Sequence, residues 1–199
     1  MSVLRTGRAL FIDVEMTCWK GEIPPGQRRE IIEFGLVEVD TAELVILREA
    51  TYLVRPRVSE VSEYCTALTG ITPQEVKRDG RPLEEVLRTM AKDFGPARKP
   101  LLAWGNDWVC LQEDCEAAGC VNPFPREAFT DIGRVGTLLW GSGGRLGLDK
   151  ARAILGLESP DGRHRALIDA RATAELYMSM ATMVRAYAVT PERNMPLGS

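Results

Sequence analysis

The sequence predicts an α/β fold built on a mixed sheet, in which the first three strands are antiparallel, later strands are parallel, and helices flank the sheet. Two observations predict it: strand-like apolar segments fill the beginning of the chain, and helical patterns dominate after them. Of the 199 residues, 45% are hydrophobic, which is enough for one substantial core. We expect a single domain over residues 1–187 and a flexible tail over residues 188–199.

The strands come first. After Arg8 the chain reads ALFIDVE, an unbroken apolar run that ends in acids, typical of a central strand covered on both faces. EIIEFGLVEVD from Glu30 and ELVILREATYLVRP up to Pro56 are rich in β-branched and aromatic residues. The short turn at Asp40 to Ala42 should join them as a hairpin. LLAW from Leu101 is short enough to be a fourth strand.

Helical patterns follow the strands. SEVSEYCTALTG ends on Gly70, and RPLEEVLRTMAKDFGP opens with a proline and closes with Gly95, as helices commonly do. DWVCLQEDCEAAG should form a helix that stops at Gly119. More helix is expected in the segments that begin near Ile132, Leu146 and Leu167.

The composition excludes several classes of protein. Charged residues make up 27% and the formal net charge is -3, so the chain is neither a polybasic nucleic-acid coat nor an acidic disordered tail. The five cysteines form no CxxC pair and only one histidine accompanies them, so we expect buried reduced thiols rather than a structural zinc site. No stretch approaches the ~20 apolar residues of a membrane span, and the start does not resemble a signal peptide. A cytoplasmic protein with no membrane partner is expected.

Two acids end the first predicted strand. Asp13 and Glu15 are two residues apart, so they project from the same face of a strand. Two carboxylates at the end of a buried segment repel each other unless water or a cation compensates, and hard cations such as Mg²⁺ or Mn²⁺ prefer oxygen ligands. Two ordinary acids at a solvent-facing strand end are the open alternative.

His164 is the only histidine of the chain, and Asp169 stands five residues after it. The two side chains would diverge if both were helical, but they converge if His164 lies in the loop after SPDG and Asp169 in the first turn of the next helix. The helix dipole there favours the ionised carboxylate. A surface histidine without a function is the alternative.

Asp107 lies in LLAWGNDWVCL, between the fourth predicted strand and the next helix. An aspartate at this position can serve as a helix N-cap. The end of a parallel strand is also where open α/β folds gather ligand groups, so Asp107 could face the acids of the first strand. The local pattern leaves both alternatives open.

Three segments together resemble the motifs of the DEDDh 3′ to 5′ exonuclease superfamily, the DnaQ-like proteins. DVE at Asp13 to Glu15 matches the first motif, the aspartate of WGND the second, and HRALID from His164 to Asp169 the third. The strings FIDVEMTCW, EIIEFG, YCTALTGI and AWGNDW are similar to the ERI-like or KapD-type branch, whose members trim 3′ ends of RNA and sometimes DNA. At Ile168 that branch usually has a second aspartate, and here the chain resembles the proofreading exonucleases instead.

The resemblance implies a ribonuclease H-like fold and a site for two Mg²⁺ or Mn²⁺ ions. The implied metal ligands are Asp13, Glu15, Asp107 and Asp169, with Asp13 bridging the ions and Asp107 acting largely through coordinated waters. Glu15 and His164 are the implied catalytic residues, and His164 would activate the attacking water. The implied reaction hydrolyses phosphodiester bonds at 3′ ends of single strands or overhangs and releases nucleoside 5′-monophosphates. The ERI-like strings favour RNA, with DNA as the alternative.

Substrate contacts are expected from Met16, Thr17, Leu68, Trp104 and His164. Met16 occupies the family's terminal-nucleotide position, and Leu68 resembles the apolar wedge beside the last base. Trp104 ends a buried strand, so core packing is the alternative that we favour for it. The arginines at positions 28, 29, 163 and 165 could contact phosphates, although arginines in polar loops are more often solvated.

Two other functions are compatible with parts of this pattern. The first is a non-catalytic nucleic-acid-binding or complex-forming module with an exonuclease fold, but all five site residues are intact. The second is a metal-dependent hydrolase or oxygenase for small molecules, but such sites usually recruit more than one histidine. The sequence leaves open whether the chain forms a homodimer.

Overall fold

A computed structural model describes residues 7–96, 99–141, 143–162 and 164–189 of the chain. Its centre is a five-stranded sheet with the order β3-β2-β1-β4-β5. The strands are β1 (Arg8–Met16), β2 (Ile31–Asp40), β3 (Val45–Leu53), β4 (Leu101–Ala103) and β5 (Phe129–Asp131). β1 to β3 pair antiparallel, whereas β4 and β5 continue the sheet in parallel from β1. The predicted mixed sheet is therefore confirmed, and β5 is a strand that the sequence did not predict.

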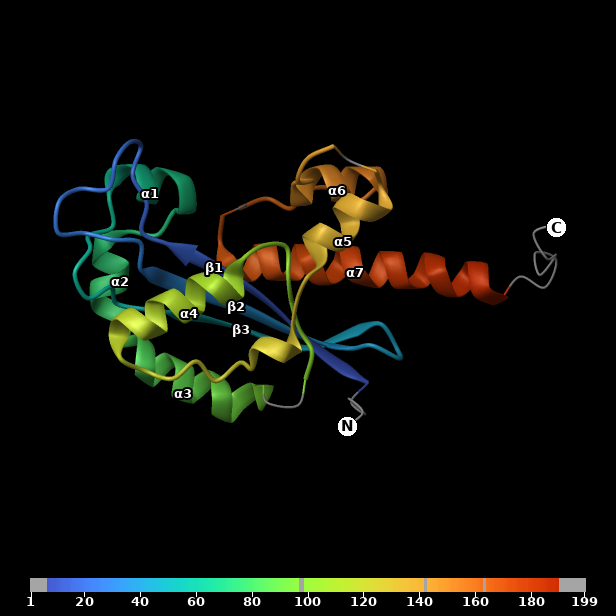
Figure 1. The fold of residues 1–199 in the computed structure, drawn as a ribbon, viewed down its shortest axis with the longest axis horizontal. Coiled ribbons are helices and arrows are strands. Elements are labelled where there is room, and N and C mark those ends of the chain that lie inside the picture. The colour runs from blue at the N-terminus through green and yellow to red at the C-terminus, as the bar shows by residue number, and fades with distance from the viewer. Residues whose placement is uncertain (1–6, 97–98, 142, 163, 190–199) are drawn as a thin grey trace.

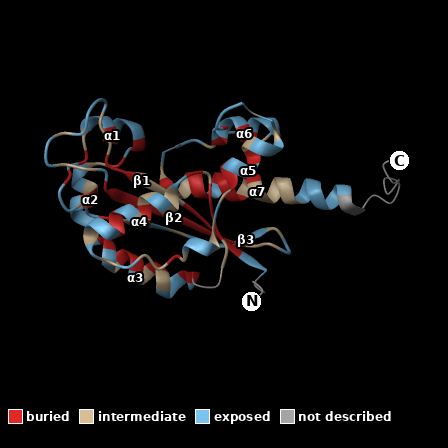
Figure 2. Ribbon diagram, in the orientation of Figure 1, coloured by how far each residue is buried: buried red, intermediate tan, exposed pale blue. Residues whose placement is uncertain are grey.

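β1 is buried on both faces, which explains its unbroken apolar run. Leu10 and Ile12 belong to a core cluster that includes residues of α3 (Leu83–Phe94) and α4 (Asp107–Ala118). Ala9 and Phe11 point the other way and pack with α7 (Ala166–Val189). Two layers of helix thus enclose the sheet, with α7 crossing behind it and projecting beyond it (Figure 1). Figure 2 shows that the buried residues follow the strands and the helix sides facing them.

The helix ends match the predicted stop signals. Gly70, Gly95 and Gly119 each adopt a left-handed backbone directly after a helix, and this conformation is accessible to glycine without steric cost. The remaining helical segments are α1 (Glu63–Thr69), α2 (Pro73–Asp79), η2 (Arg126–Ala128), α5 (Ile132–Leu139) and α6 (Leu148–Ile154).

Three further predictions concern the whole chain. α7 continues to Val189, and residues 190–199 of the expected tail lie outside the described part, so the flexible tail stays a prediction. All five cysteines are free thiols, as expected, but only Cys65 and Cys115 are buried and the other three are half-buried. Among the described residues, no helix combines the length and the apolar composition needed to cross a membrane.

Helix α2 was not predicted, although its start carries a recognisable signal. The Thr72 side chain accepts a hydrogen bond from the backbone of Glu75 at 3.1 Å, and the Glu75 carboxylate accepts one from the backbone of Thr72 at 3.5 Å. This reciprocal capping box satisfies two backbone donors that a helix otherwise leaves without partners. The spacing of threonine and glutamate in TPQE is therefore the pattern that could have located α2.

Thr72→Ala should lower the free energy of unfolding by about 1 kcal/mol, because it removes the N-cap acceptor of α2. Urea denaturation of the two proteins measures this difference. Thr182→Ala is the matched control, because Thr182 lies exposed within α7 and its hydroxyl donates to the helix backbone at Met178. Equal losses in both variants would contradict the capping role.

Candidate active site

Three of the predicted site residues meet at the end of β1. Glu15 on β1, His164 before α7 and Asp169 in the first turn of α7 each offer a ligand atom, and these atoms all lie within 4.8 Å of one another. The prediction that His164 lies in the loop and Asp169 in the helix is confirmed. Asp13 stands two residues before Glu15 on the same face of β1 and is half-buried, as Glu15 is.

The backbone at His164 places its imidazole beside the acids. His164 adopts a left-handed conformation with φ of 66°, which is uncommon for a residue other than glycine. Its backbone N–H donates to Oδ2 of Asp169 at 3.3 Å, so the turn and the helix carboxylate hold each other. Asp169 is buried whereas the His164 side chain is exposed, so the imidazole is accessible to water and substrate.

β2 brings the start of α7 against the acids of β1. Gly35 lies opposite Asp13 in the sheet, and a Cβ added there would come within 2.1 Å of the Ala166 backbone. Glu33, buried opposite Glu15, accepts hydrogen bonds from the Arg165 guanidinium at 2.5 Å and from the Ala166 N–H at 2.8 Å. The glycine permits the close approach, and the glutamate fixes it. Arg165 is therefore engaged with a buried carboxylate rather than solvated.

Asp107 is tied directly to the first motif. Its Oδ1 accepts a hydrogen bond from the N–H of Val14, the residue between Asp13 and Glu15, at 3.2 Å. The N-cap alternative is wrong, because Asn106 occupies the cap position and Asp107 is the first residue of α4. The side chain instead crosses to β1, which satisfies a strand N–H near the sheet end.

Burial raises the pKa of the Asp107 carboxyl to about 6. The hydrogen bond from Val14 and the nearby Arg145 act in the opposite direction, whereas the neighbouring Asp131 raises it further. The ionised carboxylate is thus poorly compensated by the protein's own groups. A bound cation would supply the missing positive charge.

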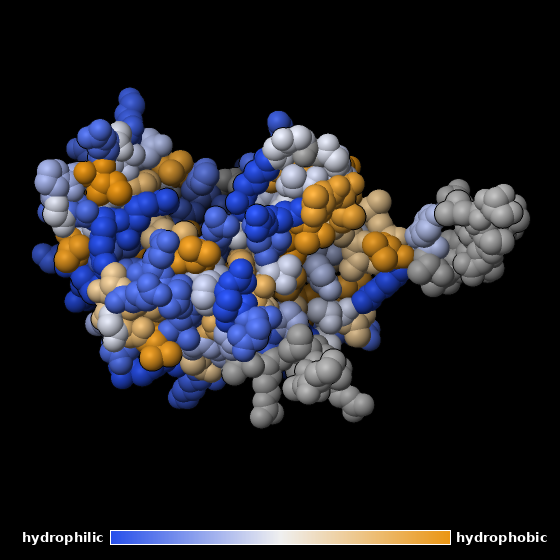
Figure 3. All heavy atoms as spheres, in the orientation of Figure 1, coloured by the Kyte–Doolittle hydropathy of each residue, from blue (hydrophilic) through white to orange (hydrophobic). Residues whose placement is uncertain are grey.

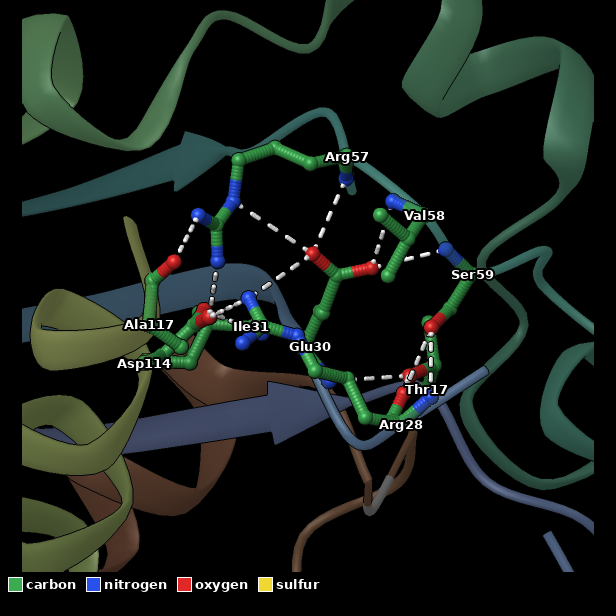
Figure 4. Close-up of polar contacts among 9 residues, drawn as sticks. All are labelled: Thr17, Arg28, Glu30, Ile31, Arg57, Val58, Ser59, Asp114 and Ala117. Atoms are coloured by element: carbon green, nitrogen blue, oxygen red, sulfur yellow. Dashed lines mark hydrogen bonds and ion pairs between the residues drawn. The ribbon is translucent and has the colours of Figure 1, made fainter. Parts of the chain in front are cut away.

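A second carboxylate fixes α4 to the sheet two turns farther along. Asp114 is buried, and its Oδ2 accepts a hydrogen bond from the N–H of Ile31 on β2 at 2.9 Å. Its Oδ1 receives the guanidinium groups of Arg28 at 3.3 Å and Arg57 at 3.0 Å, and both arginines also pair with buried Glu30 (Figure 4). Since seven residues span about two helical turns, Asp107 and Asp114 lie on one face of α4. Both hold that face against strand backbone.

The residues expected to contact substrate differ in how far they are buried. Met16 is nearly buried beside Glu15, and Leu68 is exposed on α1. The Thr17 side chain is fully buried, and its hydroxyl donates to Arg28 O at 3.1 Å and accepts from Glu30 N at 2.9 Å. The Thr17 hydroxyl is therefore used within the fold, and a contact between Thr17 and substrate stays a prediction.

Trp104 packs against α5. Its indole N–H donates to Leu146 O at 2.9 Å, and a Cβ added at Gly136 would come within 2.8 Å of its ring. This favours the core-packing alternative. Of the predicted phosphate contacts not yet placed, Arg29 lines a cavity of about 360 Å³ together with Met16, and Arg163 lies outside the described residues.

Two charged residues near the site were missed. The Arg145 guanidinium lies 3.4 Å from the Asp131 carboxylate and 3.3 Å from Trp104 O, beside Asp107. Neither residue belongs to a recognisable motif, and each is far from Asp107 in the sequence. No local signal could have placed them here.

The chain matches a family model described as exonuclease, RNase_T, over residues 10–177. It is 31% identical to ERI1 exoribonuclease 2 of Danio rerio over 209 residues, which cover 92% of this chain and 37% of that protein. It is 39% identical to 3′-5′ exoribonuclease 1 of Rattus norvegicus over 103 residues, covering 49% of this chain and 30% of that protein. The chain thus spans about a third of the length of these relatives.

A solved structure supports the same relationship. The nuclease domain of 3′hExo, described as a DEDDh family member bound to rAMP, superposes with a TM-score of 0.78 at 28% identity, covering 90% of this chain and 94% of that one. Exonuclease I of E. coli in complex with single-stranded DNA has a TM-score of 0.70 at 18% identity and shows the shared fold alone. Together with the family match, these findings establish that the chain belongs to the DEDDh exonuclease family.

Proposed function

We propose that the chain is a two-metal 3′ to 5′ exonuclease that removes nucleoside 5′-monophosphates from the 3′ ends of single-stranded nucleic acid. The observation that supports this most directly is the convergence of Glu15, His164 and Asp169 within 4.8 Å, beside an Asp107 carboxylate bonded to β1. Two motifs separated by most of the chain thus supply one constellation. It combines carboxylates that can hold cations with an accessible histidine that can accept a proton from water.

The donor set fits divalent cations, which DEDDh family exonucleases use. Carboxylate oxygens dominate it, and these are the ligands that Mg²⁺ and Mn²⁺ prefer. In this proposal Asp13, Glu15, Asp107 and Asp169 would hold the two ions. When bound, the two ions supply charge neutralisation at the scissile phosphate and at the leaving oxygen.

His164 acts as the base in the proposed reaction. The exposed imidazole accepts one proton from the attacking water, and the resulting hydroxide oxygen forms the new bond to phosphorus. The bond between phosphorus and the 3′ oxygen of the preceding nucleotide breaks, and that oxygen takes up a proton. Because Asp169 binds the His164 backbone, the position of the base is linked to that of the metal ligands.

RNA is the proposed substrate class. Relatives at 31% and 39% identity are described as exoribonucleases, and the similar nuclease domain was solved with rAMP bound. DNA is the alternative, because exonuclease I, which shares the fold, is described in complex with single-stranded DNA.

Digestion of matched RNA and DNA oligonucleotides tests both parts of the proposal. A 5′-labelled RNA in Mg²⁺ or Mn²⁺ should shorten stepwise from its 3′ end, release 5′-monophosphates and persist in EDTA, with slower loss of the DNA. Faster digestion of DNA at equal concentration would refute the RNA preference alone. No shortening of either strand in any of several divalent metals would refute the exonuclease assignment.

A further inference from the structure

A groove of about 630 Å³ lies on α5 and the loop that follows it. Its lining comprises Arg134, Thr137, Leu138, Gly143, Gly144 and Arg145. The Thr137 hydroxyl donates to Gly133 O at 2.8 Å and accepts from Leu146 N at 3.1 Å, so the loop is pinned against the helix. The Thr137 side of the groove is therefore held by hydrogen bonds within the fold.

Two guanidinium groups make this groove basic. Arg134 is exposed on α5, and within the described residues its side chain has no ion pair. Arg145 is half-exposed and pairs with Asp131, whose side chain is only 8% exposed. The Asp131 carboxylate is thus largely covered, while both guanidinium groups reach solvent. An anionic ligand would meet two positive charges here.

The groove begins beside the active site. A Cβ added at Gly105 would lie 2.9 Å from Oδ2 of Asp107 and 3.3 Å from Nη2 of Arg145. The Asp107 carboxylate and the Arg145 guanidinium therefore both lie next to Gly105. Arg145 also counteracts the elevated pKa of Asp107. The basic wall is therefore continuous with the edge of the acidic site.

The outer rim of the groove is apolar. Leu138 is 82% exposed and Leu139 is 65% exposed at the end of α5. Figure 3 shows a hydrophobic patch next to strongly hydrophilic atoms over α5 and α6. A single strand presents phosphates along one side and apolar base faces along the other. The basic wall of the groove matches the phosphates, and its apolar rim matches the bases.

We propose that the groove lined by Arg134 and Arg145 binds the phosphodiester backbone of the single-stranded substrate on the 5′ side of the nucleotide that is removed. Arg134 and Arg145 contact phosphates, and Leu138 contacts a base. This inference deepens the proposed exonuclease function and rests on it. Contacts to phosphate are independent of sequence, so the groove provides preference for length rather than for particular bases.

Arg134→Gln should reduce the preference for a 12-nucleotide RNA over a dinucleotide, measured as the ratio of kcat/KM, by about fivefold, the upper end for one exposed ion pair. The slope of log KM for the long RNA against log salt should become shallower by about 0.7, the value for one phosphate contact on a single strand. The matched control is Arg88→Gln, which removes the same charge from an exposed side chain of α3. It should keep the parental length preference and salt slope.

Each outcome separates the groove from the exonuclease assignment. An unchanged length preference in Arg134→Gln, with active parent protein, would overturn the groove and leave the exonuclease intact. If the parent hydrolyses neither RNA, the exonuclease proposal fails, and fluorescence anisotropy of the labelled 12-nucleotide RNA then decides the groove by comparing parent, Arg134→Gln and Arg88→Gln. Weaker binding of an acidic peptide but not of RNA by Arg134→Gln would also overturn it.

Discussion

Replacing Glu15 with glutamine should reduce nucleotide release from a 3′-labelled RNA by roughly a hundred- to a thousandfold, the loss typical of removing one group that stabilises developing charge. Glutamine keeps the size of the side chain but not the negative charge that faces His164 and Asp169. Cation binding at this site requires anionic oxygens, so the variant should also need more Mn²⁺ for half-maximal activity. Single-turnover digestion across a metal titration measures both effects.

Glu43→Gln is the matched control, because Glu43 is exposed in the turn between β2 and β3 and the substitution removes the same charge. It should retain parental activity and metal dependence. Circular dichroism and thermal melting establish that both variants are folded. Parental nucleotide release by folded Glu15→Gln would exclude this carboxylate from the reaction. Glu15 would then be an ordinary acid at a strand end.

The elements with local signals could be predicted from the sequence. β1 has an unbroken apolar run because Leu10 and Phe11 face two different core clusters, and Gly119 ends α4 because a left-handed residue is needed there. β5 escaped prediction because three residues carry no periodicity, and its pairing with β4 is a tertiary effect. Thus segments with an apolar or periodic pattern, including the short LLA of β4, were visible, and β5, which has neither, was not.

The supports of the site could not be predicted, because they join distant positions. Arg165 looks like a solvated loop arginine, yet it pairs with Glu33, which lies 132 residues earlier and is buried. A buried carboxylate requires such a partner, but only the fold reveals which one it finds. Asp107 has the local sequence of a cap, yet its side chain bonds to Val14, 93 residues away. The ordered motifs located the acids, and the tertiary structure supplied their partners.

Asp107→Asn should make the metal-free protein more stable at pH 8 while reducing nucleotide release by about a hundredfold. Burial raises the pKa of the Asp107 carboxyl from 3.8 to about 6, so ionisation at pH 8 costs at most about 3 kcal/mol of folding free energy. Asparagine removes that cost, and its side-chain oxygen can still accept the hydrogen bond from Val14. The melting temperature in EDTA should therefore rise, by at most about 10 °C.

The pH dependence identifies the cause of this gain. A carboxyl whose pKa is raised in the folded state binds its proton more tightly there than in the unfolded state. The parent therefore loses stability as pH increases from about 4 to 6. The stability advantage of Asp107→Asn over the parent should vanish near pH 4. Asp40→Asn is the control for which a loss of stability at pH 8 is expected, because backbone N–H groups of Glu43 and Ala42 lower the pKa of Asp40.

Saturating Mg²⁺ should stabilise the parent more than Asp107→Asn, because cation binding compensates the same charge. A lower melting temperature for metal-free Asp107→Asn at pH 8 would show that the carboxylate is satisfied by the protein alone, and Asp107 would then need no cation.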